Sequence, residues 1–182
     1  MCPHGQFCAR LVRSGQYAKP MQTTSVTDIY QLLSPRTISV GLKGKDKQEV
    51  IDGLVDLLKD HPAVQDLDAV RAAVMEREKV MSTGVGKGLA LPHAKTTAIN
   101  DTVAAFAVLA EPIDFGSIDN KPVQLVFLLV GTESAKSLHI KLLSRISRLM
   151  NRDSFRERLL KAETPEQVIS IFEEGESELL EQ

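Results

Sequence analysis

The chain has 182 residues, a length typical of a single domain that can bury its own hydrophobic core. It carries 22 basic and 24 acidic residues, for a formal net charge of −2, and no basic stripe of the kind that binds nucleic acid. No apolar run approaches the roughly 20 residues that a membrane-spanning helix needs, so we expect no stable insertion into a membrane.

The N-terminal segment differs in composition from the rest of the chain. Its first twenty residues carry three basic side chains, no acidic ones and both cysteines, Cys2 and Cys8. Cysteines confined to one end cannot support the fold as a disulfide framework, so we expect a reducing, cytoplasmic setting. Together with His4 they offer three candidate ligands at irregular spacing, and we expect no metal site. We interpret residues 1–23 as a flexible extension and residues 24–182 as the folded domain.

The first part of the domain alternates between strand and helix patterns. Residues 37–42 alternate in polarity and are rich in β-branched side chains, which predicts a strand. Residues 47–58 place apolar side chains at the spacing of one helix face, and His61-Pro62 is expected to stop that helix. We interpret His61 as a structural residue that contacts the terminal carbonyls of the helix. A second helix is predicted over residues 68–80, and one of its sides carries Val70, Ala73, Val74 and Arg77.

The second part of the domain begins with strands and ends with helices. Residues 102–109 and 123–130 are too apolar for strands with one exposed face, so we predict that both are central in a sheet. Helical patterns follow over residues 134–150, 154–162 and 165–174. This order of elements predicts a single α/β domain with a mixed sheet flanked by helices.

The most informative segment lies between the two halves and reads Ser-Thr-Gly-Val-Gly-Lys-Gly-Leu-Ala-Leu-Pro-His, from Ser82 to His93. Its glycines allow backbone conformations that other residues avoid, and they leave amide groups unshielded. A short apolar strand then meets Pro92, which presets the direction in which His93 leaves the strand. An imidazole at the mouth of a loop with free N–H groups suits a nucleophile that must carry an anion. The segment therefore predicts phosphoryl transfer through His93.

The same loop does not match nucleotide-binding motifs. A Walker A loop needs Ser or Thr after its Gly-Lys pair and a glycine five residues before it. Here Gly88 follows the pair Gly86-Lys87, and Met81 occupies the upstream position. The dinucleotide fingerprint fails as well, because Leu89 stands where its third glycine should fall. We expect no nucleotide cofactor.

A second histidine, His139, lies on the helix predicted over residues 134–150. It begins an apolar face that continues with Leu142, Leu143, Ile146 and Leu149. The opposite side, expected to be solvated, carries Lys141, Arg145, Arg148 and Arg152. A histidine one turn into a helix lies where the macrodipole favours negative charge, so a phosphoryl group nearby would be stabilised. The alternative is a core histidine bonded to a backbone carbonyl.

Three further residues are candidates for binding phosphate. Arg77 belongs to the cluster Glu76-Arg77-Glu78-Lys79, which is ordinarily interpreted as a solvated helix end with exchangeable surface ion pairs. A guanidinium can also bind phosphate oxygens bidentately. Ser82 and Thr83 supply hydroxyl donors from the glycine-containing loop, although such residues before a glycine are also common in turns.

The stretch from Glu76 to His93 resembles the active-site segment of the enzyme IIA proteins of the bacterial phosphoenolpyruvate:sugar phosphotransferase system, in the fructose/mannitol and nitrogen-regulatory superfamily. The resemblance extends over residues 24–175, and Pro112 to Val123 is similar to the nitrogen-regulatory branch in particular. Two residues depart from the family's pattern. Ala94 stands where glycine is common, and Lys87 stands where asparagine or an acidic residue is usual, so we expect Lys87 to add positive charge near an incoming phosphoryl group.

The resemblance implies a type 2 IIA fold and a phosphocarrier that needs neither cofactor nor metal. It implies that His93 accepts a phosphoryl group on its tele nitrogen, Nε2, from an HPr-type phosphocarrier protein. It implies that His139 and Arg77 stabilise that group. From the hydroxyl donors of the loop itself, we predict a phosphate-binding loop that comprises Ser82, Thr83 and Gly84. Two roles stay open. The resemblance favours a regulatory, nitrogen-type IIA whose phosphorylation state controls which partner it binds, and the alternative is a sugar-transport IIA that feeds an enzyme IIB.

Overall fold

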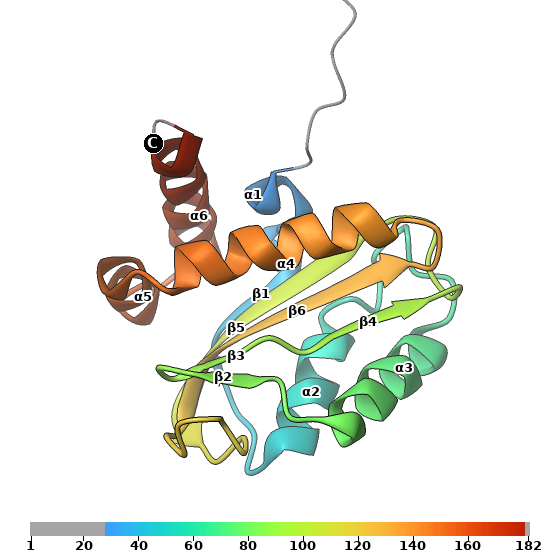
Figure 1. The fold of residues 1–182 in the computed structure, drawn as a ribbon, viewed down its shortest axis with the longest axis horizontal. Helices are drawn as coiled ribbons and strands as arrows, with labels where there is room; N and C mark the ends of the chain where they lie inside the picture. The colour runs from blue at the N-terminus through green and yellow to red at the C-terminus, as the bar shows by residue number, and fades with distance from the viewer. Residues whose placement is uncertain (1–27, 181–182) are drawn as a thin grey trace, which may run out of the picture.

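The computed structural model of the protein describes residues 28–180. The predicted extension over residues 1–23, with Cys2, His4 and Cys8, lies outside the described residues. In the described part, a six-stranded mixed sheet carries helices on both faces (Figure 1). The predicted fold class is therefore confirmed.

The sheet is built around two long, apolar strands. Its strands are β1 (Ile38–Leu42), β2 (Gly84–Gly86), β3 (Leu89–Ala90), β4 (His93–Thr96), β5 (Val103–Ile113) and β6 (Val123–Thr132). Their order in the sheet is β1-β5-β6-β3-β2, and β4 also pairs with β6. β5 and β6 are antiparallel, whereas β3 and β4 both run parallel to β6. The prediction that β5 and β6 are central is confirmed.

The helices form two layers. They are α1 (Ile29–Leu32), α2 (Lys47–Asp56), α3 (Leu67–Val80), α4 (Lys136–Met150), α5 (Asp153–Leu160) and α6 (Pro165–Leu180). α2 and α3 lie on one face of the sheet, while α4 crosses the other face and α5 and α6 pack near one of its ends (Figure 1). None of the helices within residues 28–180 is long and apolar enough to cross a bilayer.

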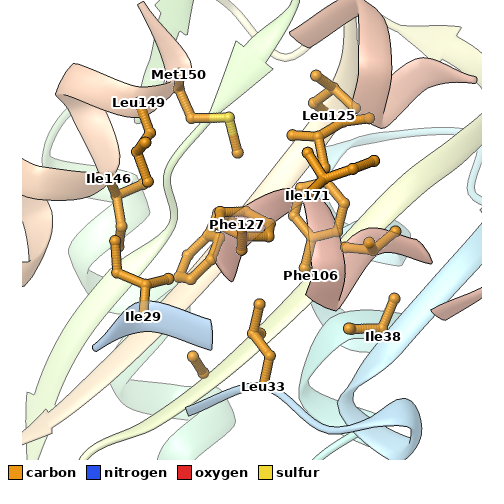
Figure 2. Close-up of a cluster of buried hydrophobic side chains, with 14 of the residues drawn as sticks. Ile29, Leu33, Ile38, Phe106, Leu125, Phe127, Ile146, Leu149, Met150 and Ile171 are labelled. Atoms are coloured by element: carbon orange, nitrogen blue, oxygen red, sulfur yellow. The ribbon is translucent and has the colours of Figure 1, made fainter. Parts of the chain in front are cut away.

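Each layer of helices closes its own hydrophobic cluster against the sheet. Because side chains alternate along a strand, Phe106 of β5 points to the α4 side while Ala105 and Ala107 point to the α2 and α3 side. Figure 2 shows the α4 side, with Phe127 of β6 among side chains from α1, α4 and α6. The Phe127 and Phe172 rings lie 5.6 Å apart in an edge-on arrangement that aromatic pairs prefer.

The C-terminal ends of α2, α5 and α6 differ from their predictions, and α5 ends at Leu160, two residues before its predicted end. α2 ends at Asp56, and the chain reaches His61-Pro62 through tight turns. His61 has a structural contact of another kind than expected: its Nδ1 accepts the Ala63 amide (3.2 Å), and within residues 28–180 its ring makes no hydrogen bond to a helix carbonyl. α6 continues to Leu180, six residues past the predicted end, because its buried face continues through Gly175. A Cβ on Gly175 would meet the Phe155 ring at 2.5 Å.

A buried carboxylate joins three helices on the α4 side. Glu176 of α6 is 3% exposed, and its oxygens accept the backbone amides of Ile29 (2.9 Å) and Tyr30 (3.0 Å) at the start of α1. Arg145 of α4 forms ion pairs with Glu176 and with Asp28, each at 3.1 Å. The prediction that Arg145 lies on a solvated helix side is therefore wrong. Its position borders the buried face of α4, and a buried partner carboxylate draws it inward.

Candidate functional site

His93 begins β4, where the chain rejoins the centre of the sheet. It pairs in register with Leu129 of β6, and the Leu129 amide donates to the Pro92 carbonyl (3.0 Å). Proline lacks an amide but keeps this carbonyl, so the chain stays against β6 on both sides of Pro92. The sequence predicts that His93 follows the end of a strand. In the structure it is instead the first residue of the next strand, β4.

The ring of His93 is half-buried and oriented by a backbone carbonyl. Its Nδ1 lies 2.8 Å from the oxygen of Leu91. A carbonyl only accepts hydrogen bonds, so Nδ1 must donate, and in the neutral ring Nε2 then carries the free lone pair. The pKa of His93 is lowered, first by burial and also by the charge of Arg77, while the Leu91 contact and the charge of Glu78 oppose the shift. The ring is therefore neutral at pH 7.

His139 lies beside His93, with the two ring centroids 5.9 Å apart. It is 5% exposed, as expected for a residue that begins the buried face of α4. Burial, followed by the charges of His93 and Lys95, lowers the pKa of His139 to about 4. Its buried Nδ1 has no hydrogen-bond partner within residues 28–180, and a Cβ on Gly131 would meet this nitrogen at 2.6 Å. The His139 ring also lines the pocket described next.

Both histidines and Arg77 line one pocket of about 420 Å³, which we call the histidine pocket. Its lining is Ala73, Arg77, His93, Ala94, Lys95, Glu133, His139, Ile140 and Leu143. Arg77 extends from the last turn of α3, and its Nη1 donates to the Met81 carbonyl (3.1 Å). The pocket thus combines a neutral nucleophile with two cations, Arg77 and Lys95, and one carboxylate. Such an arrangement can accept an anionic group at His93 and balance its charge.

The residues predicted as a phosphate-binding loop do not line the histidine pocket. The Ser82 hydroxyl donates to the Phe115 carbonyl (2.8 Å) and accepts the Gly84 amide (3.3 Å). Thr83 is 4% exposed, and its hydroxyl donates to the Glu78 carboxylate (2.6 Å). These groups serve the fold, and direct phosphate binding by Ser82, Thr83 and Gly84 stays a prediction.

Lys87 occupies a turn that directs it away from the histidines. It has a left-handed φ of 56° between Gly86 and Gly88, with φ of 92° and 75°. Its amide donates to Asp119 (2.8 Å), and its ammonium donates to Asn151 at the far end of α4 (2.6 Å). The expectation that Lys87 adds charge near an incoming phosphoryl group is wrong, because its side chain lines a different pocket.

The sequence reasoning missed Glu78, which it grouped with exposed neighbours. The Glu78 side chain is only 4% exposed, whereas the Glu76 side chain is 71% exposed. Glu78 is bonded to Thr83 and to Lys47 beneath the loop. A signal was present, because Glu78 follows the buried residues Val70 and Val74 at a spacing of four along α3.

One protein-family model matches most of the chain. The model of the phosphoenolpyruvate-dependent sugar phosphotransferase system, EIIA 2, matches residues 31–175.

Relatives with different names each align to more than three quarters of the chain. A fructose-specific EIIABC component from Bacillus subtilis (strain 168) is 38% identical over 79% of this chain. The aligned part is only 23% of that relative's length. A nitrogen regulatory protein from Pseudomonas aeruginosa is 32% identical over 78% of this chain and 92% of its own. Among solved structures, nitrogen regulatory protein IIA-Ntr from Neisseria meningitidis superposes with a TM-score of 0.75. It is 29% identical, over 79% of this chain and 98% of its own.

Proposed function

Because the chain belongs to the EIIA 2 family of the phosphoenolpyruvate-dependent sugar phosphotransferase system, we propose that His93 accepts a phosphoryl group on Nε2 and passes it on. The observation that supports this most directly is the contact between the His93 Nδ1 and the Leu91 carbonyl (2.8 Å). It holds the ring proton on Nδ1, and so it leaves the Nε2 lone pair available for attack.

The transfer step needs no net movement of protons. The Nε2 lone pair of His93 attacks the phosphorus of a donor phosphohistidine, and a nitrogen–phosphorus bond forms at His93. The donor's own nitrogen–phosphorus bond breaks, and its electron pair returns to the donor ring, which is protonated on its other nitrogen and so leaves as a neutral imidazole. The His93 ring, now substituted on both nitrogens, carries the positive charge. The Nδ1 proton of His93 stays on that nitrogen throughout, hydrogen-bonded to the Leu91 carbonyl. Charge in the loose transition state spreads over the three equatorial oxygens of the phosphoryl group.

Three groups of the histidine pocket are placed to stabilise that charge. The Arg77 guanidinium and the Lys95 ammonium supply positive charge from α3 and β4. His139 is neutral, and its Nδ1 is enclosed against Gly131, so its proton is best placed on Nε2, facing the pocket. In that tautomer Nε2 can donate a hydrogen bond to a phosphoryl oxygen.

The partner that supplies the phosphoryl group is an HPr-type phosphocarrier protein in this proposal. The walls of the histidine pocket include the apolar side chains of Ala73, Ala94, Ile140 and Leu143. Ile140 is 66% exposed and would meet a protein that approaches His93. A small apolar surface of this kind suits a transient contact in the cytoplasm, as a carrier that must release each partner requires.

Two downstream roles are compatible with the site. We infer a regulatory role, in which phosphorylation of His93 controls partner binding, because a relative named as a nitrogen regulatory protein matches over 92% of its length. The second candidate, delivery to an enzyme IIB for sugar uptake, is favoured by the 38% identity to a fructose-specific EIIABC component. Affinity capture with phosphorylated and unphosphorylated protein separates them, since sugar delivery requires capture of an enzyme IIB that then takes up the label.

The direct test is incubation with phosphoenolpyruvate, enzyme I and HPr. We expect one acid-labile phosphoryl group per chain, no label on the His93→Ala variant and normal label on the His61→Ala variant. Retention of label by His93→Ala would overturn the assignment. For His139→Ala we expect onward transfer to slow by about 10²- to 10³-fold, the usual cost of losing one transition-state donor.

A further inference from the structure

The buried carboxylate of Glu78 holds the loop that precedes β2. Its two oxygens each lie 3.1 Å from the Thr83 amide, and one of them accepts the Thr83 hydroxyl (2.6 Å). Lys47 of α2 forms an ion pair with the same carboxylate (2.9 Å). Thr83 is thus anchored through both its backbone and its side chain by a residue of α3.

A path of hydrogen bonds continues from this anchor to the active histidine. The Thr83 carbonyl accepts the Leu91 amide (3.0 Å). The Leu91 carbonyl in turn accepts from the Nδ1 of His93 (2.8 Å). Three consecutive contacts therefore join the Glu78 carboxylate to the imidazole, and the intermediate residues are held at both their amide and their carbonyl groups.

We propose that Glu78 is a positioning residue for His93. By fixing Thr83 it fixes the Leu91 carbonyl, and that carbonyl selects the tautomer in which Nε2 is unprotonated and faces the histidine pocket. The consequence for phosphoryl transfer rests on the function proposed above. The effect on the ring itself does not, because the tautomer exists whether or not a donor arrives.

Lys47 makes this arrangement stable in a buried setting. Its ammonium balances the Glu78 charge, donates to the Ser82 hydroxyl (3.1 Å) and lies 4.9 Å from the centre of the Phe115 ring. Ser82 bonds onward to the Phe115 carbonyl (2.8 Å). A buried carboxylate persists when it is paired and its lone pairs are used, and both conditions hold here. The loop is therefore held from two helices.

Glu78 also acts on His93 through its charge. It raises the pKa of the imidazole, against the effects of burial and of Arg77. The other charged or titratable groups lining the histidine pocket are Lys95 on β4, Glu133 after β6 and His139 on α4. Removing the Glu78 charge should accordingly lower the pKa of His93 and leave the other groups in place.

The test compares Glu78→Gln with Glu176→Gln, because both residues are buried carboxylates that accept backbone amides and pair with a cation. Nitrogen-15 NMR of the histidines reports the tautomer and the pKa of His93. Phosphoramidate, a small phosphoryl donor, reports the reactivity of His93 without a protein partner. In Glu78→Gln we expect a lower His93 pKa, a mixture of tautomers and labelling slowed by roughly 10- to 100-fold, as misplacement of a reacting group produces. In Glu176→Gln we expect none of these changes.

Two milder variants keep the test decisive if Glu78→Gln does not fold. Thr83→Val removes the hydroxyl contact but keeps the amide contact, and it should shift the tautomer in the same direction. Thr83→Ser restores the hydroxyl and should restore the wild-type tautomer. A wild-type tautomer and rate in both Glu78→Gln and Thr83→Val would overturn the positioning role. Wild-type protein that shows the Nδ1–H tautomer but takes no label from any donor would instead overturn the proposed function.

Discussion

Among the described residues, each face of the sheet buries one carboxylate, and the two are used differently. Glu176, on the α4 side, ties α1 to α6 through backbone amides and to α4 through Arg145. Glu78, on the α3 side, begins a hydrogen-bond path that ends on the ring of His93. Burial and ion pairing are alike at the two sites, so neither property distinguishes structure from function. The distinguishing feature is where the path of contacts ends.

His139 completes this comparison from within α4. It lies six positions before Arg145 on the same helix, and Arg145 has two ionic partners whereas the buried Nδ1 of His139 has no partner within residues 28–180. A buried polar atom without a partner costs stability and calls for a reason. The reason we infer is that an unpartnered Nδ1 leaves the ring proton on Nε2, the nitrogen that we propose donates to a phosphoryl group on His93.

The largest expected effect comes from removing the cation that pairs with Glu176, the buried carboxylate with a structural role. Arg145→Met leaves the Glu176 carboxylate buried without its cation, which should lower the free energy of unfolding by about 3–5 kcal/mol. Urea denaturation measures the loss, and phosphoramidate labelling of the folded protein should remain at the wild-type rate. As a control, Arg71→Met breaks pairs with the more exposed Asp52 and Asp56 and should cost about 1 kcal/mol or less. Equal losses would contradict the account.

Stability measured as a function of pH tests the lowered pKa of His139 in the histidine pocket. His139 has a pKa of about 4 in the folded protein, whereas a histidine in the unfolded chain has a pKa near 6.5. The unfolded state therefore binds more protons between these values, and stability should fall as the pH drops from about 6.5 to 4, by at most about 3 kcal/mol. His139→Leu should lack this part of the acid sensitivity, measured by denaturation at each pH. Parallel pH curves for the two proteins would show that His139 titrates normally.

Two glycines offer a matched pair with smaller effects. A Cβ on Gly131 would meet the His139 Nδ1 at 2.6 Å, and one on Gly175 would meet the Phe155 ring at 2.5 Å. Each alanine variant should lose about 1–3 kcal/mol from overpacking, with Gly175→Ala recovering part of it through helix propensity. Only Gly131→Ala should displace the His139 ring and change its NMR titration. A changed His139 titration in Gly175→Ala would remove the distinction between the two glycines.

Much of the fold could be predicted because local patterns and tertiary contacts agree. The apolar sequences of β5 and β6 predict their central position, and the period of α4 places His139 on the buried face. His93, His139 and Arg77 do line one pocket, as the resemblance implied, because the β4–β6 register and α4 bring distant segments together.

The rest depends on contacts between residues far apart in the sequence. Glu78 looks like its exposed neighbour Glu76 until Lys47, 31 positions earlier, provides a buried partner. Arg145 likewise turns inward because Glu176, on another helix, needs a cation. The glycine-containing loop suggested free amides, but Glu78, Ser82 and Asp119 occupy the amides of Thr83, Gly84 and Lys87. The spacing of apolar residues identifies the buried face of a helix. The partner of a buried charged side chain is known only once the fold is known.

The measurement that tests the account most directly is the site of the nitrogen–phosphorus bond. After phosphorylation by HPr, long-range proton–nitrogen NMR of histidine-labelled protein should place phosphorus on Nε2 of His93, with Nδ1 still protonated against the Leu91 carbonyl. Phosphorus on Nδ1 of that ring, or on His139, would contradict it.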